Sequence, residues 1–240
     1  MIHPTDYLAD SRGDIARILK ESGQLFYRHR RILLLLLLLA LLLAALILPL
    51  EMDWLHTVQG QPDPSLRRWA KRLSFWGDWY TGSLIFCGLV WLAGWIKRQG
   101  YLRQAALGCL LAALLSGLFS DVFRYGLGRA RPNAGFAPGL YGPSLQSRFH
   151  SFPSGHTTTA FGTAVATAVL FPPLSLPALT LAGGVAWSRL YLNYHHPSDI
   201  LMGCVVGSSF GVVFGAATRR SGRKSGYRDG QIEPQGPETA

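Results

Sequence analysis

Long apolar segments alternate with short polar connections along most of the chain. The first, 32–50, is uncharged and almost wholly aliphatic, and it follows the basic run His29-Arg30-Arg31. Its length matches the roughly 20 apolar residues that a helix needs to cross a bilayer. Five further apolar segments follow at 80–96, 105–122, 154–172, 174–191 and 199–217. The pattern predicts an all-α fold, an integral membrane bundle of six spanning helices.

The composition agrees with a membrane protein and divides the chain into three parts. Apolar residues make up 49% of the 240 positions and charged residues only 15%, a composition that is unusually apolar for soluble domains. We predict an amphipathic cytoplasmic segment at 1–31, a membrane domain at 32–217, and a basic, disordered cytoplasmic tail at 218–240.

The segment 32–50 also has features of a secretory signal peptide, because a basic run precedes a hydrophobic one. Two observations favour an uncleaved helix instead. The apolar stretch begins only at residue 32, and no clear small-x-small cleavage pattern precedes Glu51. We therefore predict that this segment remains as the first membrane helix.

Basic residues orient the predicted bundle. With six spans, both termini lie on one side together with the loop 97–104, and this side carries more Lys and Arg than the other. Because basic loops stay in the cytoplasm, we expect both termini to be cytoplasmic. The net charge of +10 suits an anionic membrane, and no segment resembles a nucleic-acid-binding module.

The last apolar segment repeats glycine every four residues, at Gly203, Gly207, Gly211 and Gly215. Small residues at this spacing lie on one helix face and let two transmembrane helices approach closely. Packing within the bundle is the simpler interpretation. A dimer interface is the alternative, so the oligomeric state stays open.

The segment 64–76 places Leu66, Trp69, Leu73 and Trp76 at near-helical spacing, with basic residues between them. This pattern is typical of a helix on the outer membrane surface, with its tryptophans inserted and its cations toward lipid phosphates. A solvated helix packed on the bundle gives a similar pattern.

Three short clusters in the second half of the chain carry the polar groups that suggest chemistry. They are Arg124-x6-Arg131-Pro132, Pro153-Ser154-Gly155-His156 and Ser188-Arg189-x5-His195-x3-Asp199. Planar guanidinium groups match phosphate oxygens, so three of them indicate a phosphoryl site. One histidine can attack phosphorus while the other protonates the leaving oxygen, and an aspartate can orient the nucleophile. The clusters predict a metal-free phosphatase that forms a phosphohistidine.

The clusters also converge in the predicted topology. The first ends the third span, the second begins the fourth, and the last runs from the end of the fifth into the sixth. All three then fall on the non-cytoplasmic side. We expect the active site at those helix ends, near lipid headgroups.

Each cluster has a plainer structural interpretation. Ser154 and Asp199 could each be only a helix N-cap, and His156 only a satisfied histidine at a helix start. Arg131 could belong to a loop that happens to be basic. Because ionisable groups beside membrane spans are costly, their joint presence favours function. His196 lacks the motif spacing, which indicates a structural or headgroup contact.

The clusters resemble the signature of the type 2 phosphatidic acid phosphatase superfamily, which reads Lys-x6-Arg-Pro, Pro-Ser-Gly-His and Ser-Arg-x5-His-x3-Asp. Order and spacing agree in all three parts, from Arg124 to Asp199. One position departs, since Arg124 stands where the pattern usually has Lys. The charge is kept, but a guanidinium fork replaces an ammonium group.

The resemblance implies a role for each matching residue. His195 is the expected nucleophile, Asp199 orients it, and His156 serves as acid and base. The groups expected to hold the phosphate oxygens are Arg124, Arg131, Arg189 and the backbone at Ser154 and Gly155. We expect no metal and no cofactor, because arginines neutralise the transition-state charge.

The expected activity is removal of phosphate from a lipid phosphate or diphosphate at the outer face of a bacterial inner membrane. The resemblance suggests undecaprenyl diphosphate, phosphatidylglycerol phosphate, phosphatidate and lipid A 1-phosphate as substrates. A lipid phosphotransferase with the same intermediate and a catalytically lapsed lipid-binding membrane protein are the alternatives. Vanadium-dependent haloperoxidases share the signature but are soluble, so the membrane segments disfavour that activity.

Overall fold

The computed structural model describes residues 4–61, 63–224, 227–228 and 231–232. Its helices are α1 (Pro4–Ile47), α2 (Glu51–Gln59), α3 (Pro64–Gly77), α4 (Leu84–Ile96), α5 (Gly100–Leu127), α6 (Gly155–Leu170), α7 (Ser175–Tyr191) and α8 (Pro197–Lys224). Two short antiparallel strands, β1 (Tyr227–Arg228) and β2 (Gln231–Ile232), follow α8. The prediction of a helical fold is confirmed for these residues.

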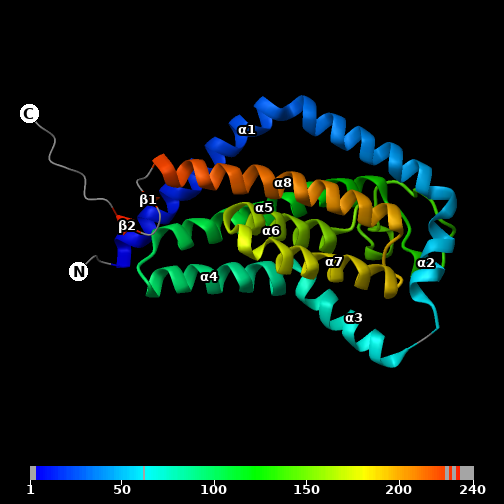
Figure 1. The fold of residues 1–240 in the computed structure, drawn as a ribbon. Helices are drawn as coiled ribbons and strands as arrows, with labels where there is room; N and C mark the ends of the chain where they lie inside the picture. Colours follow the sequence, from blue (N-terminus) through cyan, green and yellow to red (C-terminus); the bar gives the residue numbers. More distant parts are fainter. Residues whose placement is uncertain (1–3, 62, 225–226, 229–230, 233–240) are drawn as a thin grey trace, which may run out of the picture.

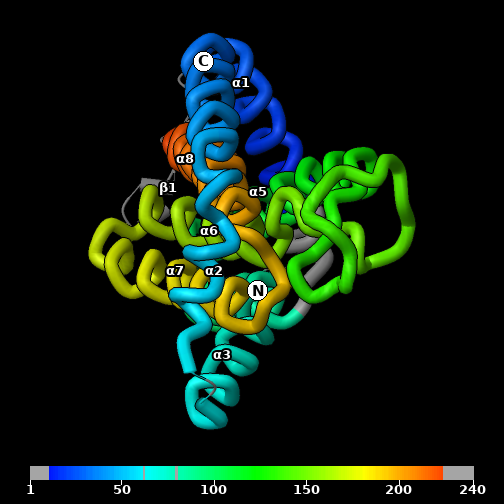
Figure 2. The backbone as a smooth tube through the Cα atoms, turned by 90° about the vertical axis from the view of Figure 1, so that its right-hand side faces the viewer, coloured from blue at the N-terminus to red at the C-terminus, as the bar shows by residue number. Residues whose placement is uncertain are grey.

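Helices α4 to α8 run side by side along one axis, and α1 crosses over α8 (Figure 1). The start of α1 and the end of α8 lie at one end of this bundle. Helix α2, the loop 128–154 and the turn between α7 and α8 lie at the opposite end. Figure 2 views that second end, where α1, α3 and the loop extend outward in different directions. The start of α1 and the end of α8 therefore lie at the opposite end of the bundle from the three sequence clusters.

All six predicted apolar segments are helical, but they differ in length. Among the residues that the structure describes, three helical stretches are long and apolar enough to cross a membrane, namely Ser11–Gln59, Gly100–Leu127 and Pro197–Arg223. A fourth arises if Pro64–Gly77 and Thr81–Ile96, which are bent by 71°, count as one span. Helices α4, α6 and α7 have only 13, 16 and 17 residues. Six membrane crossings therefore stay a prediction.

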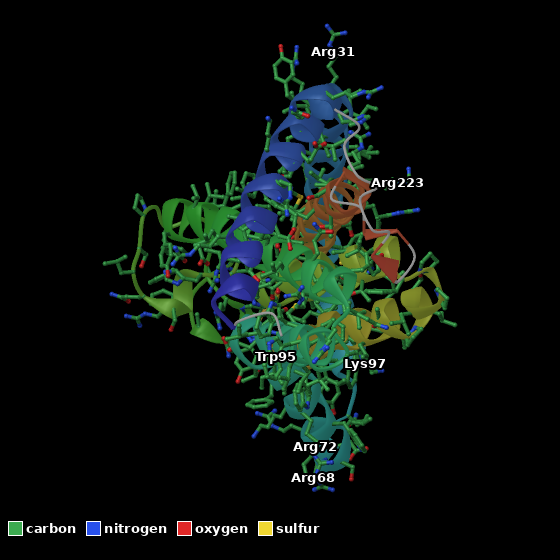
Figure 3. The ribbon with its side chains drawn as sticks, turned by 90° about the vertical axis from the view of Figure 1, so that its left-hand side faces the viewer. Arg31, Arg68, Arg72, Trp95, Lys97 and Arg223 are labelled. Atoms are coloured by element: carbon green, nitrogen blue, oxygen red, sulfur yellow. The ribbon has the colours of Figure 1, made fainter. Side chains whose placement is uncertain are left out.

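Helix α1 runs through the predicted boundary at residue 31 without a break. No Gly or Pro occurs between Gly23 and Pro49, so nothing in that stretch ends the helix. Its first half packs Ile18 and Leu25 into a buried cluster with Phe214 of α8. The side chain of Arg31 projects away from the bundle (Figure 3).

The glycine repeat of α8 lies against α6. A methyl group at Gly211 would come within 2.9 Å of the carbonyl oxygen of Gly162, and one at Gly207 would collide with the carbonyl oxygen of Thr158. The two backbones are therefore in direct contact along this seam, which larger residues would open. The structure thus confirms the prediction that the glycine repeat of α8 packs within the bundle.

Several hydroxyl groups inside the bundle form hydrogen bonds within it. The hydroxyl of Thr163 donates to the carbonyl of Thr159 at 3.1 Å, and that of Thr167 donates to the carbonyl of Thr163 at 2.8 Å. Ser83, the N-cap residue of α4, shares a hydrogen bond of 2.8 Å with Thr163 of α6. Satisfied hydroxyl groups of this kind are compatible with a bilayer, where an unpaired polar group is costly.

The predicted helix at 64–76 is confirmed as α3. Asp63 caps it by accepting from the backbone N–H of Ser65 at 2.7 Å, and Pro64 occupies its first turn. Trp69 and Trp76 are exposed. Arg68 and Arg72 project from α3 away from the bundle (Figure 3). Its placement on a membrane surface stays a prediction.

The predicted tail at 218–240 begins inside a helix, because α8 continues to Lys224. The bundle contacts extend this far, as Thr218 is fully buried. Apart from 227–228 and 231–232, the residues after Lys224 lie outside the described part of the chain, and so does the predicted disorder.

Candidate active site

The three clusters meet at the end of the bundle that carries α2 and the loop 128–154 (Figures 1 and 2). Helices α5 and α7 end there, and helices α6 and α8 begin there. The contributions are Arg124 from the last turn of α5, Gly155 and His156 from the first turn of α6, Arg189 from the last turn of α7, and Asp199 from the first turn of α8. Arg131 and His195 lie in the connecting loops.

His156 lies at the centre of this group. Its ring is within electrostatic range of Arg189, His195, Arg124 and Arg131. The sequence separates these residues by up to 71 positions along the chain, so only the fold brings them together. The predicted guanidinium groups and both predicted catalytic histidines therefore share one site.

Hydrogen bonds hold two of the three arginines, and all three keep a donor free. Arg124 Nη1 donates to Asp121 Oδ1 at 2.6 Å, and Arg189 Nη1 donates to the hydroxyl of Ser74 on α3. Within the described residues, the buried Nε groups of Arg124, Arg131 and Arg189 have no hydrogen-bond partner. Buried donors without a partner are rare because each costs free energy. Three of them in one site fit the binding of an anion with several oxygens.

Tyr194 lies between two of the arginines. Its ring centroid is 4.5 Å from Arg189 Cζ and 6.0 Å from Arg131 Cζ. Burial lowers the pKa of Arg131, and the nearby charge of Arg124 lowers it further. Positive charges that repel one another remain together here, partly offset by the tyrosine face and by Asp199.

The first turn of α6 approaches Arg124 closely. A Cβ atom at residue 155 would lie 2.7 Å from Arg124 Nη1, so the guanidinium rests against the glycine. Ser154 occupies the N-cap position, but its side chain makes no capping hydrogen bond; the hydroxyl accepts instead from Thr157 at 3.0 Å. The helix start thus lies where an anion held by Arg124 would meet backbone N–H groups.

His195 is buried and its ring orientation is set by hydrogen bonding. Nδ1 lies 2.8 Å from the carbonyl oxygen of Ser151 and 3.6 Å from Asp199 Oδ2. Since a carbonyl only accepts, Nδ1 carries the proton and Nε2 keeps its lone pair. Burial lowers the pKa of His195 to about 3, so the ring is neutral near pH 7. These are the properties of a nucleophilic imidazole.

Asp199 is fully buried and uses both of its oxygens. Oδ2 accepts from the hydroxyl of Ser151 at 2.5 Å and from the backbone N–H of His196 at 2.8 Å. Oδ1 accepts from Arg129 Nη1 at 2.5 Å. The bond to His196 is a helix-capping contact at the start of α8, so Asp199 supports the helix as well as the site.

His196 does not enter the group around His156. Its ring is buried, and Nε2 lies 3.2 Å from the carbonyl oxygen of Ala130. Nδ1 lies 3.6 Å from Glu51 Oε1. Of the two roles predicted from the sequence, a structural contact or a headgroup contact, the structure favours the structural contact for His196.

Several residues of the site carried no signal in the sequence. Ser151 contributes a backbone carbonyl, which no motif reveals. Ser74 contacts Arg189 from a distant segment, and Tyr194 contacts Arg189 from a position between two motif residues. Arg129 could have been noticed as one more arginine in the first cluster. Its partner Glu51 lies 78 positions earlier, and sequence spacing alone does not connect them.

The second half of the chain is similar to known proteins. The family model described as the PAP2 superfamily matches residues 105–223. A lipid A 1-phosphatase of Rhizobium johnstonii is 34% identical over 103 residues, which cover 42% of this chain and 42% of that protein. A decaprenylphosphoryl-5-phosphoribose phosphatase of Mycobacterium tuberculosis is 29% identical over 155 residues, which cover 62% of this chain and 79% of that protein.

A solved structure shares the fold. The crystal structure of a transmembrane PAP2-type phosphatidylglycerolphosphate phosphatase from Bacillus subtilis superposes with a TM-score of 0.61 at 22% identity, covering 80% of this chain and 96% of that chain. The chain spans less than half the length of the matched lipid A 1-phosphatases from two Rhizobium species. This chain aligns with 42% and 44% of their lengths.

Proposed function

Residues 105–223 of this chain belong to the PAP2 superfamily, and from this premise we propose that the protein is a metal-independent lipid phosphate or diphosphate phosphatase. The observation that carries the proposal is the group of three arginines with free buried donors around His156 and His195. A phosphoryl group is the chemical partner that such a set of guanidinium forks fits best.

The proposed reaction has two steps. The Nε2 lone pair of His195 attacks phosphorus in line, a P–N bond forms, and the P–O bond to the leaving group breaks. His156 gives a proton to the departing oxygen. His156 then takes a proton from water, which attacks phosphorus, breaks the P–N bond and releases phosphate. Arg124, Arg131 and Arg189 hold the nonbridging oxygens in both steps.

The surroundings of His195 suit this sequence of events. Because Nδ1 donates to the Ser151 carbonyl, Nε2 is the nitrogen that stays available. When Nε2 bonds to phosphorus the ring becomes positive, and the carboxylate of Asp199 at 3.6 Å stabilises that charge. A phosphate dianion bound among the arginines likewise stabilises a protonated His156.

An apolar cavity supports a lipid as the substrate. A cavity of about 590 Å³ opens between α3, α4, α6 and α7. It begins close to the site, since Ala160 lies one turn below His156 and Val185 one turn before Arg189. Its hydroxyl groups at Thr163 and Thr167 are already bonded within the protein, so the lining suits a hydrocarbon chain.

The placement of the site supports action on one leaflet. The clusters lie at the end of the bundle opposite the start of α1 and the end of α8 (Figure 1). With both termini in the cytoplasm of a bacterial cell, the site faces the outer leaflet of the inner membrane. Substrates would then be dephosphorylated after they have reached that leaflet.

Phosphate release by the purified protein tests the proposal. The panel contains lipid A 1-phosphate, phosphatidylglycerol phosphate, phosphatidate and undecaprenyl diphosphate, with glycerol 3-phosphate as the tail-free control. We expect release from at least one lipid, little from glycerol 3-phosphate, resistance to EDTA and inhibition by vanadate, which imitates the five-coordinate transition state. Activity that is lost with EDTA and restored by a divalent metal would refute the mechanism. Transfer to an added acceptor lipid would identify a phosphotransferase.

A further inference from the structure

Glu51 is a buried carboxylate that no cluster of the sequence includes. It is the first residue of α2, it is 3% exposed, and it precedes the stretch 105–223 that matches the family model. An acidic residue at a helix start has a plain explanation in the helix dipole. That explanation accounts for an exposed residue such as Asp53, but not for the burial of Glu51, since burying a charge is costly unless it is paired.

Glu51 is paired with the catalytic end of the bundle. Oε1 accepts from Arg129 Nη2 at 2.5 Å, and Oε2 accepts from the hydroxyl of Ser198 at 2.6 Å. Ser198 immediately precedes Asp199. The carboxylate therefore ties α2, and through it the end of α1, to the start of α8.

Arg129 connects Glu51 to Asp199. Its Nη1 donates to Asp199 Oδ1 at 2.5 Å and to the hydroxyl of Ser198 at 2.7 Å, while Nη2 donates to Glu51. The side chain is buried, and its guanidinium has a carboxylate on either side. Glu51 therefore contacts Arg129, which in turn contacts Asp199, the residue that faces His195.

The formal charges give this arrangement a meaning. Asp199 and Arg129 alone would form a neutral pair, which would weaken the stabilisation of a positive ring at His195. The second carboxylate, Glu51, offsets Arg129 and leaves the buried trio with one net negative charge. That charge is what a phosphorylated imidazole needs, because a low-dielectric site strengthens its effect.

We propose that Glu51 and Arg129 are positioning residues for His195: Arg129 aligns the carboxylate of Asp199, and Glu51 restores the negative charge that Arg129 would otherwise cancel. This inference rests on the proposed phosphatase function. It assigns a role in the chemistry to the segment after the first hydrophobic helix, outside the stretch that matches the family.

The test measures kcat, KM and melting temperature of variants with the lipid phosphate that the wild type hydrolyses. Glu51→Gln keeps the shape of the side chain and removes its charge. We expect kcat to fall by about 10- to 100-fold, the range seen for residues that support a reacting group indirectly, with KM unchanged because the phosphate contacts remain. Asp53→Asn on the same helix is the matched control, and it should leave kcat unchanged.

The double variant Glu51→Gln/Arg129→Gln separates charge from architecture. It removes one charge of each sign, so Asp199 again supplies a net negative charge although it loses its alignment by Arg129, and kcat should recover part of the loss and exceed that of Glu51→Gln. A purely structural role predicts that the double variant is no better than Glu51→Gln. Failure to recover would overturn the proposed charge balance.

Two further outcomes are decisive. If Glu51→Gln does not fold, Ser198→Ala replaces it, because it removes only a hydroxyl that donates to Glu51 and accepts from Arg129. A lower kcat at constant KM supports the inference, and an unchanged kcat overturns it. A wild type that releases no phosphate from any lipid phosphate refutes the proposed function itself. An active wild type together with a fully active Glu51→Gln refutes only the inference drawn from the trio.

Discussion

Gly155 offers a direct test of the position of Arg124. An alanine methyl group at this residue would lie 2.7 Å from Arg124 Nη1 and 3.4 Å from its Cζ. Since favourable contacts between heavy atoms lie at about 3.5–4.0 Å, the guanidinium must move by about 1 Å. It is the far end of a flexible side chain, so it can move without disturbing the helix.

The expected loss is kinetic. A displacement of about 1 Å from the productive geometry costs on the order of 100-fold in rate, and a hydrogen bond to a charged group contributes about 1.5–3 kcal/mol. In a helix, alanine is favoured over glycine by about 0.5–1 kcal/mol. Gly155→Ala should therefore lower kcat/KM by about 10- to 100-fold and leave Tm unchanged or slightly raised.

Phosphate release and thermal unfolding of the same preparation measure both effects. Gly183→Ala in α7 is the matched control, because its new methyl group meets nothing within 4 Å, and it should keep full activity. In an Arg124→Lys background, Gly155→Ala should cost little more, since the colliding Nη1 is gone. Full activity of Gly155→Ala would refute the reasoning. An equal loss in both backgrounds would show that the effect does not act through Arg124.

His195→Ala should abolish phosphate release in a protein that still folds, whereas His196→Ala should keep most of the turnover, because His196 contacts the Ala130 carbonyl outside the group around His156. The opposite results would move the nucleophile by one residue. On a background without the native cysteines, Leu145→Cys should react with a membrane-impermeant thiol reagent in intact cells and Gln99→Cys should not, and the reverse would invert the topology. Burial lowers the pKa of His195 from 6.5 to about 3, so the unfolded chain takes up the proton at a higher pH than the folded protein does. His195 should therefore lower the stability of the fold as pH falls from 6.5 towards 3. Ring ¹⁵N shifts, assigned with His195→Gln, should show a neutral His195 ring at about pH 5.

Local spacing in the sequence could predict which candidate residues lie together where their separations along the chain are short. His195 and Asp199 are four positions apart, and a helix start between them brings the carboxylate back toward the imidazole. The same spacing could not tell which acceptor binds Nδ1. The acceptor at 2.8 Å is the Ser151 carbonyl, a backbone group that every residue possesses.

The trio of Glu51, Arg129 and Asp199 was beyond the reach of pattern reasoning. Buried ion pairs give no periodic signal in a sequence. The three residues come from three segments that meet only when α2 docks on α8. The boundary at residue 31 divides a cytoplasmic segment from a membrane segment, and it stays a prediction. Helix α1 continues through it because Arg and Leu both favour helix.

The glycine seam between α6 and α8 bears on how such a protein can diverge. Both helices begin in the site, α6 next to His156 and α8 with Asp199, and their separation is set by backbone contact at Gly207 and Gly211. The spacing of these reacting groups is therefore inherited by every descendant that keeps the glycines. The exposed leucines of α1 and α4 carry no such constraint. Selection can refit the outer surface to another lipid or another bilayer while the chemistry at the helix ends is conserved.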